Sequence, residues 1–177
     1  MKKGNSIYLR SLTEDDFTER YLSWFCDPEV TRFLFARNIT REDAVKHLRD
    51  GIKTGNWHMY AICEVKGGRH IGNIKIGPID KHNGVSDLVT VIGERDAWGR
   101  GYGREAVGLA TRVAFGELGI RKLSASIDSR NIGSIKAYTA AGFEVETSLK
   151  NQYRDEASGE LSDKVFFSCF NPNVSYV

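Results

Sequence analysis

The stretch from Val89 to Ala106 constrains the fold of this chain more than any other part of the sequence. It reads Val-Thr-Val-Ile-Gly-Glu-Arg-Asp-Ala-Trp-Gly-Arg-Gly-Tyr-Gly-Arg-Glu-Ala. An apolar β-type run enters it, glycines at alternate positions form a turn, and apolar residues at helical spacing follow. A strand, a glycine turn and a helix together present free backbone N–H groups and the positive end of a helix dipole to an anion. The stretch therefore predicts an anion-binding turn or, alternatively, a tight strand-to-helix connection without a ligand.

Size and charge limit the kinds of partner that such a turn serves. The 177 residues predict one domain, residues 1–177, long enough to bury a core. With 25 basic and 23 acidic side chains the formal net charge is +2, which is too small to indicate nucleic acid or a membrane surface as the partner. Arg95, Arg100 and Arg104 cluster in the glycine stretch itself, which favours a local phosphate group as the ligand.

Cysteines and histidines give no sign of a disulfide framework or a metal centre. Cys26, Cys63 and Cys169 are far apart in the sequence, as is typical of reduced thiols. No histidine lies at metal-ligand spacing from a cysteine or another histidine, so no metal is expected. The basic N-terminus is not followed by an apolar run, and no run approaches 18 apolar residues. We therefore expect a cytoplasmic protein that does not enter a membrane.

Patterns along the chain predict a mixed α/β fold, with antiparallel hairpins before the glycine turn and alternating helices and strands after it. The expected strands are residues 6–12, 57–65, 70–79, 85–93, 121–127, 143–153 and 161–170. Helical segments are expected within 13–25 and 29–35, from Thr40 to residue 51 or 55, over 101–118, and from Asn131 to 141. Asn83-Gly84 predicts a tight hairpin turn.

A second motif decides between the two interpretations of the glycine turn. Residues 131–143 read Asn-Ile-Gly-Ser-Ile-Lys-Ala-Tyr-Thr-Ala-Ala-Gly-Phe, and residues 98–103 read Trp-Gly-Arg-Gly-Tyr-Gly. Together they resemble the GNAT superfamily of acetyl-CoA-dependent N-acetyltransferases. Residues 98–103 are similar to that family's Gln/Arg-x-x-Gly-x-Gly/Ala pyrophosphate loop. Residues 131–143 are similar to its Asn-x-x-Ser…Tyr…Gly-Phe segment, which flanks the acyl-CoA thioester.

The resemblance covers nearly the whole chain and implies a fold and a reaction. The implied fold is the GNAT-like acyl-CoA N-acyltransferase fold, an α+β arrangement with a mostly antiparallel central sheet of about seven strands and flanking helices. The implied reaction moves an acetyl group from acetyl-CoA to a primary amine by direct attack in a ternary complex, without a metal. An alternative from another class is an acyl-CoA-binding sensor or scaffold that does not catalyse, which the presence of Tyr138 disfavours.

One residue departs from the general family pattern. Trp98 stands where the general motif has Gln or Arg. A Trp-Gly-x-Gly-Tyr loop resembles the branch that includes ribosomal-protein N-terminal acetyltransferases and many small-molecule enzymes. Residues 9–16 and 21–30 also resemble that branch, and residues 21–30 are similar to members that acetylate amino sugars in surface-polysaccharide pathways.

The resemblance also assigns roles to residues. The residues expected to bind acetyl-CoA are Val91, Ile92, Gly93, Trp98, Gly99, Arg100, Gly101, Tyr102, Gly103, Arg104, Asn131 and Ser134. Amides of the turn, with Arg100 and Arg104, would hold the pyrophosphate. Residues 90–93 would resemble the family's bulged strand, where the N–H of Val91 or Ile92 polarises the thioester carbonyl.

Tyr138 is the expected catalytic residue. By the resemblance it lies near the sulfur and protonates the leaving thiolate, for which a phenol of pKa about 10 is suitable. The alternative is that Tyr138 packs on the helix face with Ile135. Asn131 and Ser134 have alternatives too, since Asn is an ordinary helix cap and Ser134 would lie in the first turn.

The general base and the acceptor stay open. An alkyl amine is protonated at neutral pH, so its attack needs a base or a water chain. Glu94, Asp87 and His82 are candidates for the base, and each is also explained as a solvated surface residue. A protein N-terminus, an amino sugar nucleotide and a polyamine are open as acceptors, in a site shaped by residues 17–35, 81–84 and 153–161. A second copy of the chain, in a homodimer, is a further partner under consideration.

Overall fold

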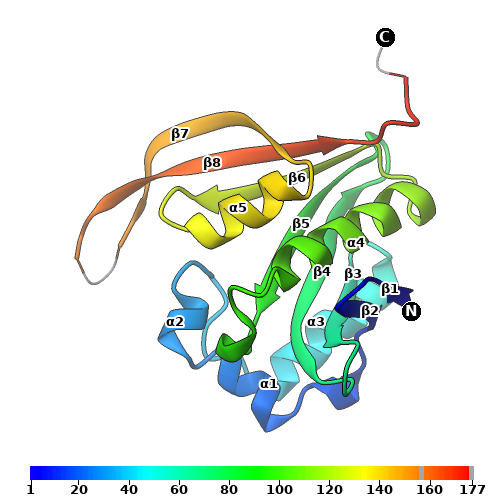
Figure 1. Cartoon of the computed structure of the whole chain (residues 1–177), viewed down its shortest axis with the longest axis vertical. Coiled ribbons are helices and arrows are strands. Elements are labelled where there is room, and N and C mark those ends of the chain that lie inside the picture. Colours follow the sequence, from blue (N-terminus) through cyan, green and yellow to red (C-terminus); the bar gives the residue numbers. More distant parts are fainter. Residues whose placement is uncertain (156–157, 176–177) are drawn as a thin grey trace.

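Eight strands form one mixed sheet in the computed structural model, which describes residues 1–155 and 158–175 (Figure 1). The strands are β1 (Lys2–Lys3), β2 (Ile7–Ser11), β3 (His58–Glu64), β4 (His70–Asp80), β5 (Val85–Ile92), β6 (Lys122–Asp128), β7 (Glu144–Arg154) and β8 (Leu161–Phe170). Their order in the sheet is β1-β2-β3-β4-β5-β6-β8-β7, and only the β5–β6 pair is parallel. The mostly antiparallel sheet is confirmed. The eighth strand is the two-residue β1, which is too short to produce a periodic pattern.

Helices cover both faces of this sheet, and their ends follow the predicted capping residues. The helices are α1 (Glu19–Trp24), α2 (Pro28–Thr31), α3 (Arg41–Thr54), α4 (Tyr102–Glu117) and α5 (Ile132–Ala140), with 3-10 turns η1 (Glu14–Asp16) and η2 (Arg95–Ala97). The Thr40 side chain accepts a hydrogen bond from the Asp43 amide at the start of α3, and Gly55 ends that helix in the left-handed conformation. Local sequence therefore determines these boundaries.

Two apolar layers hold the helices to the sheet. The layer on the face of α4 and α5 includes Ile62, Ile74, Leu88, Val107 and Phe143. The layer on the opposite face includes Phe17, Tyr21, Trp24, Leu48 and Ala61 and lies under α1 and α3. Phe17, Tyr21 and Trp24 thus have the packing role that helical spacing predicts, whereas Phe35 is exposed.

β5 and β6 lie side by side only where both begin. Their residue pairs are Val85–Lys122, Ser86–Leu123 and Asp87–Ser124, although β5 continues to Ile92 and β6 to Asp128. Past Asp87 the two strands separate, and the sheet divides into a leaf of β1 to β5 and a leaf of β6, β8 and β7 (Figure 1). This separation leaves one edge of β5 without a neighbouring strand.

A bulge lies at the end of the stretch where we expected one, residues 90–93. The amides of Gly93 and Glu94 both donate to the Ile71 carbonyl oxygen, at 2.9 and 3.2 Å, so two residues oppose one on the partner strand. The β4–β5 register is regular from Gly72–Ile92 to Ile76–Leu88, and a second irregularity lies between Ile76 and Ile79. Pro78 lies in this second part, where a residue without an N–H cannot donate to the ladder.

Asp16 connects β2 to the 3-10 turn η1. Its carboxylate accepts hydrogen bonds from the Arg10 guanidinium at 2.7 and 2.5 Å and from the Thr13 amide at 2.8 Å. Burial by itself would raise the pKa of Asp16, but these donors outweigh it and the pKa is lowered.

Asp16→Asn should lower the free energy of unfolding by about 1–2 kcal/mol at pH 7, because Arg10 loses a charged partner in a partly buried site. A carboxylate whose pKa is depressed by folding stabilises the protein above its unfolded pKa and loses that effect as the pH falls through the folded pKa. The difference from the parent should therefore shrink below about pH 4. Urea unfolding at pH 7 and pH 3 measures this. Asp15→Asn, at an exposed neighbour, is the control, and equal losses in both variants would contradict the prediction.

Candidate active site

Tyr138 fills the place where β5 and β6 separate. It comes from α5, and its hydroxyl donates a hydrogen bond to the Leu88 carbonyl oxygen at 2.8 Å and lies 3.3 Å from Thr90 Oγ1. Only 5% of the residue is exposed, and its ring packs edge-on against Phe143. Burial raises the pKa of Tyr138 well above the ordinary tyrosine range. The phenol is therefore protonated at neutral pH and is a proton donor at the free edge of β5.

The same edge of β5 exposes backbone groups to the gap. The carbonyl of Leu88 accepts from Tyr138, and that of Ile92 accepts from Trp98 Nε1 at 2.8 Å. The Gly93 amide, by contrast, donates to Ile71 of β4. Because successive residues of a strand direct their backbone groups to opposite sides, the N–H of Ile92 faces the gap and that of Val91 faces β4. Of the two expected thioester donors, the geometry favours Ile92.

The glycine turn leads directly into the N-terminus of α4. Gly99 and Gly101 have φ values of +73° and +78°, a conformation that favours glycine. A Cβ added at either would meet nothing within 4 Å, so the backbone conformation, and not crowding, requires glycine there. No side chain caps α4. Its first amides, those of residues 102–104, are therefore available to an anion.

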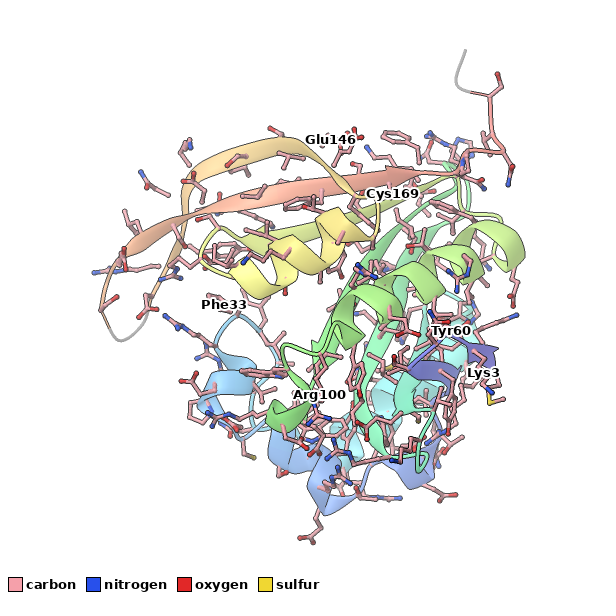
Figure 2. All side chains as sticks on the ribbon, viewed as in Figure 1. Lys3, Phe33, Tyr60, Arg100, Glu146 and Cys169 are labelled. Carbon is pink, nitrogen blue, oxygen red and sulfur yellow. The ribbon has the colours of Figure 1, made fainter. Side chains whose placement is uncertain are left out.

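Two of the three arginines in the glycine stretch are also available to bind an anion. Arg100 (labelled in Figure 2) and Arg104 are exposed. Neither makes a hydrogen bond or ion pair with any residue in 1–155 or 158–175. Arg95 instead lies 3.7 Å from the Asp27 carboxylate. Arg100 and Arg104 thus lie beside the uncapped helix end without an ion-pair partner among the described residues, although Arg100 acts electrostatically on Asp96.

Trp98, Asn131 and Ser134 have local structural roles. Trp98 is 43% exposed and ties the end of β5 to the turn through its hydrogen bond to Ile92. The Asn131 side chain caps α5 by accepting from the Ser134 amide at 3.1 Å. Contact with acetyl-CoA is compatible with both roles and stays a prediction.

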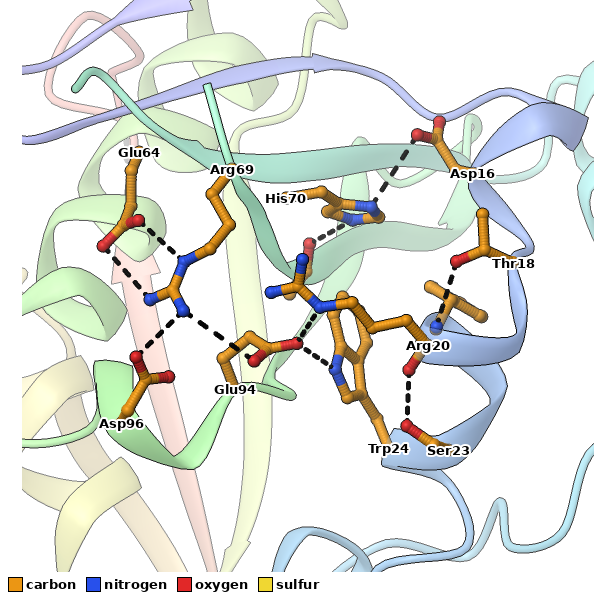
Figure 3. Close-up of polar contacts among 12 residues, drawn as sticks. Asp16, Thr18, Arg20, Ser23, Trp24, Glu64, Arg69, His70, Glu94 and Asp96 are labelled. Carbon is orange, nitrogen blue, oxygen red and sulfur yellow. Dashed lines mark hydrogen bonds and ion pairs between the residues drawn. The ribbon is translucent and has the colours of Figure 1, made fainter. Parts of the chain in front are cut away.

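Gly93 has a role that the sequence did not reveal. A Cβ at Gly93 would lie 2.0 Å from the Trp24 ring, so glycine lets the indole pack on the end of β5. Trp24 Nε1 and Arg20 Nε both donate to Glu94 Oε1 at 2.7 Å (Figure 3). Burial by itself would raise the pKa of Glu94, but these donors and Arg69 lower it. Glu94 is therefore a structural carboxylate and a poor candidate for the base.

Of the three base candidates, Asp87 is the one that acts electrostatically on Tyr138 among the described residues. Leu88 packs in the α4 layer, so Asp87, its neighbour on the strand, faces the opposite side of the sheet. Asp87 as a whole residue is exposed. Partial burial of its carboxyl group nevertheless raises the pKa of Asp87, against the opposing charges of Lys75 and Lys164. It lines a pocket of about 310 Å³. His82 is exposed in the β4–β5 turn, far from the glycine turn along both strands.

The part of the chain that the structure describes contains neither a cluster of metal ligands nor a membrane-spanning helix. Within residues 1–155 and 158–175, no three His, Cys, Asp or Glu side chains come together as a metal site. No helix in the same part of the chain is long and apolar enough to cross a membrane.

Comparison with known proteins assigns the family. Residues 6–144 match the family described as "Acetyltransferase (GNAT) domain". The chain belongs to this GNAT acetyltransferase family. It is therefore an acetyl-CoA-dependent N-acetyltransferase, as the two sequence motifs predicted.

Individual relatives leave the branch of the GNAT family and the acceptor open. The "Uncharacterized N-acetyltransferase p20" of Bacillus licheniformis is 29% identical over 169 residues, which cover 92% of this chain and 91% of p20. The ribosomal-protein-S5-alanine acetyltransferase of Vibrio fischeri superposes with a TM-score of 0.82 at 17% identity, over 98% of each chain. A spermidine N-acetyltransferase of Vibrio cholerae, solved with CoA and spermine, superposes with a TM-score of 0.82 at 15% identity, over 94% of this chain and 96% of that one. The two structures share the fold of this chain.

Gly93→Ala should lower the free energy of unfolding by about 1–3 kcal/mol, because the added methyl displaces Trp24 and its hydrogen bond to Glu94. Urea unfolding followed by circular dichroism measures the loss. The control is Gly108→Ala in α4, where a Cβ meets nothing within 4 Å and helix propensity predicts a gain of up to about 1 kcal/mol. An unfolding midpoint for Gly93→Ala equal to that of the parent would show that Trp24 does not need this glycine.

Proposed function

We propose that this GNAT enzyme acetylates a primary amine by direct attack on acetyl-CoA in a ternary complex, with Tyr138 as the general acid. The observation that carries the proposal is the position of Tyr138, whose hydroxyl lies on the free edge of β5 between Leu88 and Thr90. The N–H of Ile92 follows on the same edge. A proton donor and an oxyanion donor on one strand edge suit the breakdown of a thioester.

The donor substrate fits the turn and the start of α4. Amides of residues 102–104, with Arg100 and Arg104, would bind the pyrophosphate of acetyl-CoA. The acyl arm would then run along the free edge of β5, past Asn131 and Ser134. In this arrangement the thioester carbonyl reaches the Ile92 N–H, and its sulfur reaches Tyr138.

The chemical steps follow from these positions. The amine nitrogen attacks the thioester carbonyl, and the Ile92 N–H stabilises the oxyanion that forms. When the C–S bond breaks, Tyr138 protonates the thiolate of CoA, whose pKa of about 8.5 makes the transfer undemanding. Asp87 accepts the proton that the amine loses through a chain of waters, because the five residues from Asp87 to Ile92 span about 16 Å.

The cysteines support direct attack without an acetyl-enzyme. Burial raises the pKa of both Cys63 and Cys169, which disfavours the thiolate that such an intermediate needs. Cys26 is exposed at the end of α1 and is not among the residues that line the gap.

Within the family we place the chain in the branch that includes ribosomal-protein N-terminal acetyltransferases and many small-molecule enzymes. The Trp98-Gly-x-Gly-Tyr form of the loop and residues 9–16 and 21–30 support this placement. The likeness of the Vibrio fischeri structure is consistent with it at the level of the fold.

A binding module without catalysis is the second candidate function. It is favoured by the hydrogen bond that the Tyr138 hydroxyl donates to the Leu88 carbonyl oxygen, because this bond engages the proton that the acid role requires. Acetyl-CoA consumption across a panel of amines separates the two functions. Tight binding of acetyl-CoA without turnover of any amine would favour the binding module.

Tyr138→Phe should lower turnover at least about tenfold and change the affinity for acetyl-CoA little, because the phenol acts on the leaving group and not on binding. Thiol release measures the first and calorimetry the second. Tyr60→Phe is the control, since Tyr60 also packs against the core but lies on β3, away from the gap. Unchanged turnover in Tyr138→Phe would remove the acid role.

Asp87→Asn should lower kcat/KM for the amine about tenfold to a hundredfold, because the amide cannot accept a proton. In the parent, kcat/KM should fall as the pH drops through the raised pKa of Asp87, since the carboxylate is then protonated, and the variant should lack this step. Asp50→Asn, exposed on α3, is the control. Full kcat/KM in Asp87→Asn, or an unaltered pH profile, would assign the base elsewhere.

A further inference from the structure

The face of the gap opposite α4 is bounded at both ends. At one end the pairing of Asp87 with Ser124 joins β5 to β6. At the other end, the segment between α2 and α3 reaches the second leaf. The Phe35 ring lies 6.3 Å from the Tyr153 ring, and the Arg130 guanidinium lies 6.0 Å from the Phe33 ring. Figure 2 labels Phe33 between α2 and the leaf of β6, β8 and β7.

Two lysines on this face have no carboxylate partner at ion-pair distance among the described residues. Lys75 on β4 and Lys164 on β8 form no ion pair with a residue in 1–155 or 158–175. The Lys164 ammonium lies over the rings of Tyr153 and Phe166, at 6.0 and 5.0 Å. Both lysines act electrostatically on Asp87, so two ammonium groups share one carboxylate.

Arg130, which precedes α5, and Lys150 on β7 are neutralised by ion pairs, whereas Arg32 lies 5.2 Å over the Phe33 ring without one among the described residues. Arg130 donates to Asp128 at 2.7 Å and to Asp155 at 3.0 Å, and Lys150 lies 2.7 Å from Asp163. Set against the single carboxylate of Asp87, Lys75 and Lys164 leave an excess of positive charge on the face from which the amine enters in the proposed reaction. Burial lowers the pKa of Lys75, as expected for an ammonium group that lacks a close counter-ion.

This excess charge discriminates between kinds of amine. A polyamine would bring further positive charge to a positive surface and would be repelled. An amine whose scaffold carries a negative group would supply the missing counter-ion through charge-assisted hydrogen bonds. Asp87 would stay free to accept the proton of the amine. The exposed Phe35, at 90% exposure, and Tyr153 add flat apolar surface beside Lys164.

We infer that the acceptor is a small amine that also carries an anionic group, phosphate or carboxylate, and that Lys75 and Lys164 select it by pairing with that group. The inference deepens the proposed function and rests on it, because it concerns the acceptor of the same reaction. It assigns Lys75 and Lys164 to specificity and leaves proton transfer to Tyr138 and Asp87.

Matched probes test the inference by calorimetry on the full chain saturated with CoA. The probes are glucosamine, glucosamine 6-phosphate, UDP-glucosamine, glutamate and spermidine. The phosphorylated or carboxylated amines should bind at least about tenfold more tightly than glucosamine and spermidine, with a preference that weakens as salt is added. The comparison among the three anionic probes shows whether phosphate or carboxylate is the preferred source of the charge.

Lys164→Gln should reduce the preference for the anionic probes about tenfold. Lys150→Gln should not change it, since Lys150 lies on the same leaf but is already paired with Asp163. Equal binding of glucosamine and its phosphate, tighter binding of spermidine, or no binding of any anionic probe would overturn the inference. Turnover is scored separately: an anion preference in binding without acetylation of any amine would count against the proposed function and leave the charge selection standing.

Discussion

The separation of β5 from β6 after Asp87 is the constraint on which the site depends. A strand edge buried without partners is costly, because each unpaired N–H and C=O loses its hydrogen bonds to water. Side chains satisfy part of this edge, since Tyr138 donates to the Leu88 carbonyl and Trp98 donates to the Ile92 carbonyl. By the alternation along the strand, the N–H groups of Thr90 and Ile92 and the Thr90 carbonyl stay open on the same edge. In the proposed reaction, the Ile92 N–H of this edge is the backbone donor to the substrate carbonyl.

The two faces of the gap differ in chemistry, and in the proposed reaction each face binds a different substrate. The face of α4 and α5 offers uncapped amides and unpaired arginines, which suit a pyrophosphate. The opposite face offers Asp87, on which the charges of Lys75 and Lys164 act. Tyr138 reaches the strand edge that both faces share. A donor and an acceptor entering from opposite sides would therefore meet at the point where the proton donor lies.

Charged residues near the site belong to two groups, and their partners tell the groups apart. Glu94, Arg20, Arg69 and Asp96 bind one another in a network that fixes Trp24 against the end of β5 and positions the start of η2 (Figure 3). Arg100, Arg104, Lys75 and Lys164 lie close by without an ion-pair partner among the described residues. Paired charges stabilise the scaffold, whereas unpaired charges beside a gap are available to a ligand.

The sequence by itself determined the order of strands and helices, the caps at Thr40 and Asn131, the glycine turn and the family, because each depends on residues close together in the chain. Tertiary structure decided the rest. Ile92 and not Val91 faces the gap because of the pairing between β4 and β5, and Gly93 is needed because Trp24, from a distant helix, packs on it. Asp87 is preferred to Glu94 and His82 as the base only because of the groups that surround each of the three side chains in the folded protein. Such distinctions rest on contacts between segments far apart in sequence, and no local pattern of residues encodes them.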